Sequence, residues 1–182
     1  MKPRGELWMR AAMFASRAHR GHDRKDGQTP YFSHVARVAL IASSVFGVDD
    51  EKTLAIALLH DTIEDTTVDF DEISGAFGDE IAHAVGLLSK DMRLPEDERE
   101  REYDARLGTA DWRVHLVKLA DQYDNLSDTI SDGRSDKKVR KRIEGCRRAI
   151  HVAQSTSDRE DVARAIEIVR AFADAAEGKL GN

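Results

Sequence analysis

The 182-residue sequence contains one cysteine, three prolines and only 6% aromatic residues. The single cysteine, Cys146, excludes an internal disulfide and a zinc site built from several cysteines, and it fits a reducing compartment. No apolar run approaches the roughly 18 residues that cross a membrane. The N-terminal stretch carries charges within and after its short apolar patch, unlike a signal peptide, so we expect a cytoplasmic protein.

An excess of basic residues is also missing. The chain has 28 Lys+Arg against 34 Asp+Glu and a net charge of −6, which argues against a nucleic-acid or membrane-surface partner. A local basic pocket for a small anion remains compatible with this balance. The one strongly basic run, Lys137–Arg148, has no interleaved aromatic residues, so an exposed helix face explains it better than nucleic-acid binding. The sequence does not indicate an oligomeric state.

Few prolines and apolar residues at three-and-four spacing favour helices, and no strand is expected. We predict an all-α fold, a single helical bundle of about eight or nine helices that spans residues 1–182, with boundaries uncertain by about two to four residues. The expected helices cover about residues 5–20, 31–46, a segment carrying 54–65, 70–76, 79–89, 96–106, 112–131, 135–154 and 158–176. The last of them, over about 135–178, are interpreted as packing elements.

Polar residues occupy positions of the predicted helices where apolar residues belong. His60 shares a helix face with Ile56 and Ala57, and Asp61 continues a face that begins with apolar residues. An unpaired buried carboxylate costs several kcal/mol unless a cation accompanies it. A bound metal ion and a salt bridge at the helix end both explain this pair.

Two more such positions lie elsewhere in the chain. Asp121 follows Val114 and Val117 on one face of its helix, and His34 shares a face with apolar residues only. A satisfied core histidine and a solvated helix end are the alternative explanations. Together with His60 and Asp61, however, these residues make a set of two imidazoles and two carboxylates, which suits Mn²⁺, Fe²⁺ or Zn²⁺.

These residues carry a recognisable pattern. The sequence resembles the HD-domain metal-dependent phosphohydrolases and, more narrowly, the hydrolase domain of the RelA/SpoT family, which removes the 3′ pyrophosphate from (p)ppGpp with Mn²⁺. The resemblance covers about residues 12–130 through the segments AHRGHDRKDGQTPYFSHVARVA, ALLHDTIEDT, GDEIAHAVGLLSKD and VKLADQYDNL. The chain is too short for the synthetase and regulatory domains of long members, so the resemblance implies a stand-alone hydrolase, like the small alarmone hydrolases.

The resemblance also implies a role for individual residues. The metal ligands would be His34, His60, Asp61 and Asp121, and Glu64 and Asp65 would orient and activate the attacking water. Arg24 and Lys25 would meet the nucleotide, and Asn125 would contact its ribose. An anionic substrate also needs a basic mouth, which the first loop and its flanks could form with Arg17, His19, Arg20, His22, Arg24 and Lys25. Lys90 is a further candidate for this mouth.

Three positions depart from the family pattern. Gln122 replaces a usual arginine, Asp124 replaces a usual histidine, and Asp128 stands where a threonine is common. The metal ligands are intact, but an extra carboxylate beside an anionic nucleotide leaves the substrate open. NADPH or a nucleoside monophosphate is therefore an alternative substrate. A nucleotide sensor without turnover and a purely helical interaction protein are alternatives from other classes.

Overall fold

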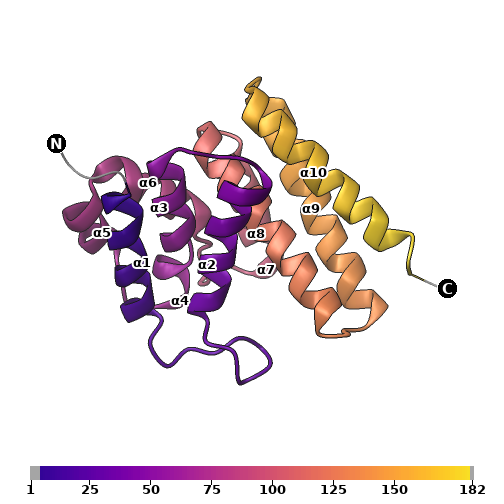
Figure 1. Cartoon of the computed structure of the whole chain (residues 1–182), viewed down its shortest axis with the longest axis horizontal. Helices are drawn as coiled ribbons and strands as arrows, with labels where there is room; N and C mark the ends of the chain where they lie inside the picture. The colour runs from indigo at the N-terminus through magenta and orange to yellow at the C-terminus, as the bar shows by residue number, and fades with distance from the viewer. Residues whose placement is uncertain (1–4, 181–182) are drawn as a thin grey trace.

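The structure is a computed structural model that describes residues 5–180, so the expected domain limits at residues 1 and 182 lie outside the described residues. Within them the chain forms ten α-helices and one π-helical stretch (Figure 1). Their bounds are α1 (Glu6–Ala18), α2 (Phe32–Leu40), η1 (Ile41–Val45), α3 (Glu51–Leu59), α4 (Thr62–Asp65), α5 (Phe70–Phe77), α6 (Asp79–Leu88), α7 (Glu96–Leu107), α8 (Trp112–Ser131), α9 (Asp136–Thr156) and α10 (Glu160–Glu177). The predicted all-α fold is confirmed, and between residues 5 and 180 the only strand-like feature is an isolated bridge from Asp23 to Pro30. No helix of this region is long and apolar enough to cross a membrane.

Side-chain caps fix where several helices begin. The Asp50 carboxylate accepts the Thr53 amide at 2.8 Å at the start of α3, and the Asp111 carboxylate accepts the Arg113 amide at 2.9 Å at the start of α8. Such caps satisfy backbone N–H groups that have no partner within the helix. At the other end of the α2–η1 segment, Gly47 has a φ of 72°, a left-handed conformation that favours glycine. The side chains of Asp50 and Asp111 thus begin α3 and α8, and Gly47 ends the α2–η1 segment.

The predicted helix over residues 54–65 is divided, which is a correction to the sequence analysis. Helix α3 ends at Leu59 and the single turn α4 begins at Thr62, so His60 and Asp61 form the junction. The Thr62 hydroxyl donates to the Leu59 carbonyl at 2.6 Å, and this bond competes with the regular helical pattern. The division accounts for the tenth helix.

Helices α3 and α8 form the centre of the molecule. Helix α3 is buried on most sides and packs against α1, α2, α6 and α8, while α8 also contacts α9 and α10. Figure 1 shows α9 and α10 running side by side at one end of the molecule, with α1, α5 and α6 at the other. The amino end of α2, the α3–α4 junction and the middle of α8 consequently face one another across the core.

Candidate metal centre

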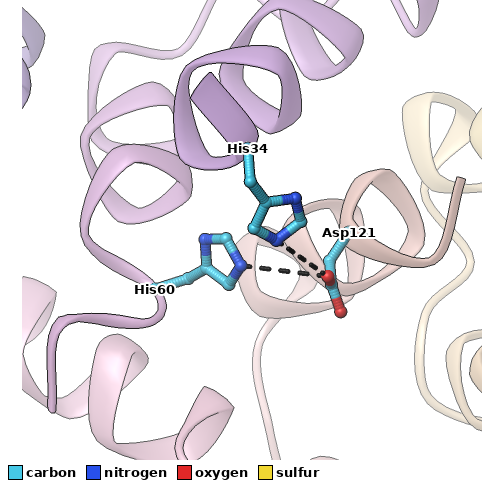
Figure 2. A group of neighbouring side chains, drawn as sticks. All are labelled: His34, His60 and Asp121. Atoms are coloured by element: carbon cyan, nitrogen blue, oxygen red, sulfur yellow. Dashed lines mark ion pairs between the residues drawn. The ribbon is translucent and has the colours of Figure 1, made fainter. Parts of the chain in front are cut away.

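The four predicted metal ligands come from three separate parts of the chain and lie close together. His34 lies on α2, His60 and Asp61 at the α3–α4 junction, and Asp121 on α8. Figure 2 shows His34, His60 and Asp121 turned toward one another, with ligand atoms of these three residues within 4.8 Å. His34 Nε2 lies 3.4 Å from both Asp61 Oδ2 and Asp121 Oδ1, and His60 Nε2 lies 3.2 Å from Asp61 Oδ1. The structure therefore brings together residues separated by up to 87 positions, counted from His34 to Asp121.

Both imidazole rings turn their Nε2 atoms toward the two carboxylates of this cluster. His34 Nδ1 lies 2.7 Å from Asp124 Oδ2, and His60 Nδ1 lies 2.8 Å from the Ala57 carbonyl oxygen. Because both partners are acceptors, Nδ1 carries the proton in the neutral form of each ring, and Nε2 then presents a lone pair. His60 Nε2 is buried and has no hydrogen-bond partner among the described residues. A buried polar atom of this kind needs an explanation, and a metal ion beside two carboxylates supplies one.

The electrostatics of the centre favour a cation. Burial opposes the charged form of His34, but the carboxylates of Asp121, Asp124 and Asp61 outweigh it and raise its pKa well above the usual value. Burial likewise opposes ionisation of Asp61, yet His60 and His34 hold the pKa of that carboxyl well below its ordinary range. Two neutral imidazoles and two carboxylates carry a charge of −2, which a divalent ion would balance. The donor set therefore fits the metal that the HD resemblance implies.

Neighbouring side chains fix the two carboxylates. Lys118 Nζ and Gln122 Nε2 donate to Asp121 Oδ2 at 2.9 and 3.0 Å, which leaves Oδ1 facing the imidazoles. The Tyr31 hydroxyl donates to Asp61 Oδ2 at 2.6 Å. Sequence reasoning assigned no role to Lys118 or Tyr31. For Tyr31 the available signal was its place in the segment before His34, directly after Pro30.

Glu64 and Asp65 line the same cavity of ≈ 180 Å³ as the four ligand candidates. Glu64 Oε2 accepts the backbone amide of Lys90 at 2.7 Å, which holds this carboxylate in place. Burial and the neighbouring Asp61 raise the pKa of Glu64. A raised pKa suits a general base that works near neutral pH. Asp65 lies on the exposed rim of the cavity.

Of the three predicted nucleotide-contacting residues, Asn125 lines this cavity, whereas Arg24 and Lys25 do not. Asn125 Nδ2 donates to Asp121 Oδ1. Arg24 lies over the Tyr31 ring, 5.4 Å from its centroid, and pairs with Asp128 at 2.7 Å. Lys25 is exposed at the surface. Its pKa is lowered by the loss of some surrounding water and by the like charges of Arg142 and Arg24.

The structure also corrects the expected basic mouth. His19 is 3% exposed, and burial lowers its pKa to about 4, so it is neutral and part of the interior. Arg17 and Arg20 are exposed, and they line neither this cavity nor a second cavity beside it, described below. The basic residues near Lys25 come instead from α9 and the turn before it, namely Arg134, Lys138 and Arg142. For Lys138 and Arg142 the sequence signal was the basic run Lys137–Arg148, which the sequence analysis assigned to an exposed helix face.

Two of the departures from the family pattern are neutralised within the protein. Asp124 is 2% exposed and accepts from Arg37 at 2.6 and 2.9 Å in addition to its contact with His34. Asp128 lies between Arg37 and Arg24, at 3.0 and 2.7 Å. These carboxylates therefore do not present unpaired negative charge to an anionic ligand.

A second cavity of ≈ 640 Å³ adjoins the first between α7 and α9. The two cavities share the lining residues Lys90, Tyr103, Lys118, Gln122 and Arg142. Arg142 and Arg148 line the second cavity, and neither forms a hydrogen bond or ion pair with another described residue. Unpaired guanidinium groups beside a metal centre are suited to an anionic ligand.

Comparisons with known proteins agree with this geometry. The family model of the HD domain matches residues 11–145. A guanosine-3′,5′-bis(diphosphate) 3′-pyrophosphohydrolase, MESH1 of Xenopus tropicalis, is 41% identical over 123 residues, which are 67% of this chain and 69% of that protein. The MESH1 of Homo sapiens is 36% identical over 153 residues, covering 82% of this chain and 86% of the relative.

A solved structure of a metazoan orthologue of SpoT, which hydrolyses ppGpp, superposes with a TM-score of 0.78. It is 28% identical and covers 94% of this chain and 97% of its own. The chain thus belongs to the HD domain family, and the resemblance to RelA/SpoT-type hydrolases is confirmed. Within that family it is a hydrolase with a His/Asp metal site.

Proposed function

We propose that the protein is a metal-dependent 3′-pyrophosphohydrolase that acts on guanosine 3′,5′-bis(diphosphate). The observation that carries the proposal is the convergence of His34, His60, Asp61 and Asp121, with His60 Nε2 buried and without a hydrogen-bond partner among the described residues. The proposed substrate is inferred from the two MESH1 relatives, which are 41% and 36% identical to this chain. A purely helical interaction protein would not need such a centre.

The four converging residues would hold the ion, which we propose to be Mn²⁺. When bound, the ion lowers the pKa of a coordinated water and polarises a phosphoryl oxygen. Oxygen and imidazole ligands without a thiolate suit Mn²⁺, although they also accept Fe²⁺ or Zn²⁺. Tyr31, Lys118 and Gln122 would keep the two carboxylates in a fixed orientation before the ion arrives.

Glu64 and Asp65 would act on the attacking water. Glu64, held by the Lys90 amide, accepts a proton from this water while Asp65 orients it from the rim. The water oxygen attacks the phosphorus bonded to the 3′ oxygen, and a new bond forms between the water oxygen and this phosphorus. The bond between the phosphorus and the 3′ oxygen breaks. The 3′ oxygen takes up a proton, so the products are pyrophosphate and a nucleotide with a free 3′ hydroxyl. Both carboxylates are present, which favours turnover over a sensor that only binds.

Arg24, Lys25 and Asn125 would contact the nucleotide. Arg24 is already oriented by Asp128 and by the Tyr31 ring, so it would contact a ligand with little loss of side-chain freedom. Lys138 and Arg142 extend the positive charge around Lys25, and Arg142 leads into the second cavity. Such local charge allows a highly anionic substrate to bind a chain whose net charge is −6.

Further features of the proposal concern the chain as a whole. We propose that residues 1–182 form one hydrolase domain and that the protein works in the cytoplasm, where its single buried thiol stays reduced. The partner is a small nucleotide rather than a nucleic acid or a membrane.

A substrate panel tests the proposed activity. Chelator-stripped protein is incubated with and without Mn²⁺ together with ppGpp, pppGpp, NADPH or a nucleoside monophosphate, and the products are separated by anion exchange. The proposal requires metal-dependent release of pyrophosphate from ppGpp. Release of orthophosphate from NADPH instead would favour the alternative substrate, and binding of ppGpp without any product would favour a sensor.

A further inference from the structure

Helices α8 and α9 approach each other closely beside the metal centre, at Gln122 and Gly145. A Cβ atom placed on Gly145 would lie 2.3 Å from Gln122 Oε1, which is closer than real atoms come. One residue further along α9, the Cys146 thiol donates to the Gln122 carbonyl at 3.6 Å. Glycine is a poor helix former, and Gly145 lies inside the 21-residue helix α9, so its presence there needs a reason.

The other end of the Gln122 amide contacts a ligand candidate. Gln122 Nε2 donates to Asp121 Oδ2 at 3.0 Å, and Lys118 Nζ donates to the same oxygen at 2.9 Å. With Oδ2 occupied by two donors, Oδ1 is the oxygen that lies 3.4 Å from His34 Nε2 and 3.9 Å from His60 Nε2. Gln122 is 8% exposed, so water competes little for this contact.

We propose that Gly145 and Gln122 act as a pair that positions Asp121. The missing side chain at position 145 leaves room for the Gln122 amide, and that amide holds the Asp121 carboxylate with Oδ1 toward the imidazoles. Gln122 is a positioning residue, since it acts through Asp121. The inference rests on the proposed metal site but not on the identity of the nucleotide.

A double-mutant cycle tests the pair with Gly145→Ala, Gln122→Ala and the double variant. The readouts are the Mn²⁺ dissociation constant of stripped protein, by titration calorimetry, and the melting temperature of the stripped protein. Each single variant should weaken Mn²⁺ binding about 10-fold or more, as loss of residues that orient ligands typically does. The double variant should bind Mn²⁺ no more weakly than Gln122→Ala, because Gly145 acts only through the amide.

The melting temperature of stripped Gly145→Ala should not fall together with its Mn²⁺ affinity. Alanine is a better helix former than glycine, and the displaced group is the far end of a flexible side chain, so stripped Gly145→Ala should melt no lower than the unaltered protein. Gly75→Ala in α5 is the matched control, since a Cβ there meets nothing within 4 Å. It should leave the Mn²⁺ dissociation constant unchanged. Gln122→Leu, which keeps the volume without the donor, should weaken Mn²⁺ as Gln122→Ala does and serves if Gly145→Ala does not fold.

Several results would overturn the proposal. Unchanged Mn²⁺ affinity in Gly145→Ala or Gln122→Leu would show that the contact is packing alone. Losses that multiply in the double variant would show that the two residues act independently. An unaltered protein that binds no Mn²⁺ would remove the site and the pair together, whereas the expected cycle in a protein that leaves ppGpp intact would overturn only the proposed substrate.

Discussion

Asp124 is a buried carboxylate that replaces a usual family histidine and takes over the support of a ligand candidate. Its Oδ2 accepts from His34 Nδ1 at 2.7 Å, and Arg37 balances its charge through two contacts. A carboxylate behind a metal-binding histidine fixes the ring and raises its basicity. The departure therefore changes how the centre is held without removing a ligand.

Changing Asp124 to Asn should weaken the centre. The amide removes one of the two charged partners of Arg37 and supports His34 less strongly, so we expect Mn²⁺ affinity to fall about 10- to 100-fold. Titration calorimetry on stripped protein measures it. Asp132→Asn is the matched control, because the one ion pair of Asp132 among the described residues is with Arg134, just past the end of α8. Equal affinities in the two variants would contradict the role of Asp124.

Changing Glu64 to Gln should separate activity from stability. Burial makes the charged form of Glu64 unfavourable, as its raised pKa indicates, so the neutral amide should leave the stripped protein at least as stable. Loss of the base should lower kcat by about 10²- to 10⁴-fold while Mn²⁺ still binds. Kinetics and thermal melting measure the two effects, with exposed Glu98→Gln as control. A kcat close to that of the unaltered enzyme would rule out the proton-accepting role.

At the scale of elements, Asp50 joins two helices at the core. Its carboxylate caps α3 through the Thr53 amide and accepts from Arg113 of α8 at 2.8 Å. Burial opposes ionisation, but Arg113 and Thr53 outweigh it and lower the pKa of Asp50 below 3.8. The stability that the ionised group contributes is therefore present above that pH and is lost as the pH falls through the lowered pKa.

Replacing Asp50 by Ala should lower the free energy of unfolding by about 1–2 kcal/mol at neutral pH, the size of a lost N-cap. Asp50→Asn keeps the cap and removes only the charge, so it should cost less and should flatten the acid limb of the stability profile. Urea unfolding between pH 2 and 7 measures both variants. The assignment fails if Asp50→Asn loses stability on acidification as steeply as the unaltered chain.

Helix α9 presents two arginines to the second cavity and a third to the opposite side. Arg142 and Arg148 form no hydrogen bond or ion pair with another described residue, while Arg147 pairs with Glu177 of α10 at 2.6 Å. Under the proposed function, Arg142→Gln should raise KM about 10-fold or more, because a charge-assisted hydrogen bond contributes about 1.5–3 kcal/mol. Arg147→Gln is the control and should leave KM unchanged. Equal KM values would exclude Arg142 from the nucleotide site.

The sequence predicted the elements well and their junctions less well. Nine of the helices follow from few prolines and from apolar spacing, because this signal is local. The break at His60 and Asp61 was missed, since the Thr62 hydroxyl that forms it also fits a continuous helix. Tyr31, Lys118 and the α9 arginines were missed for a different reason. Their roles depend on contacts between segments far apart in the chain, which periodicity does not encode.

At the scale of the whole molecule, the metal centre ties together α2, the α3–α4 junction and α8. Any ion that binds the folded but not the unfolded chain adds stability that rises with its concentration, about 2.7 kcal/mol at 100 times the dissociation constant. Mn²⁺ should therefore raise the melting temperature of stripped protein, and a chelator should reverse the rise. Differential scanning fluorimetry measures the shift, which His60→Ala should abolish. A shift that persists in His60→Ala would place the ion elsewhere.

Helix α8 carries Asp121 of the proposed metal site and Asn125 of the proposed nucleotide contact, and its Asp128 pairs with Arg24. Asn125 itself binds both Asp121 and Arg24. The same helix therefore affects both the selectivity for the nucleotide and the affinity for the ion. A laboratory effort to retarget the enzyme would do better to change the loop between α1 and α2 or the arginines of α9, because a change at Asn125 would also disturb its contact with Asp121.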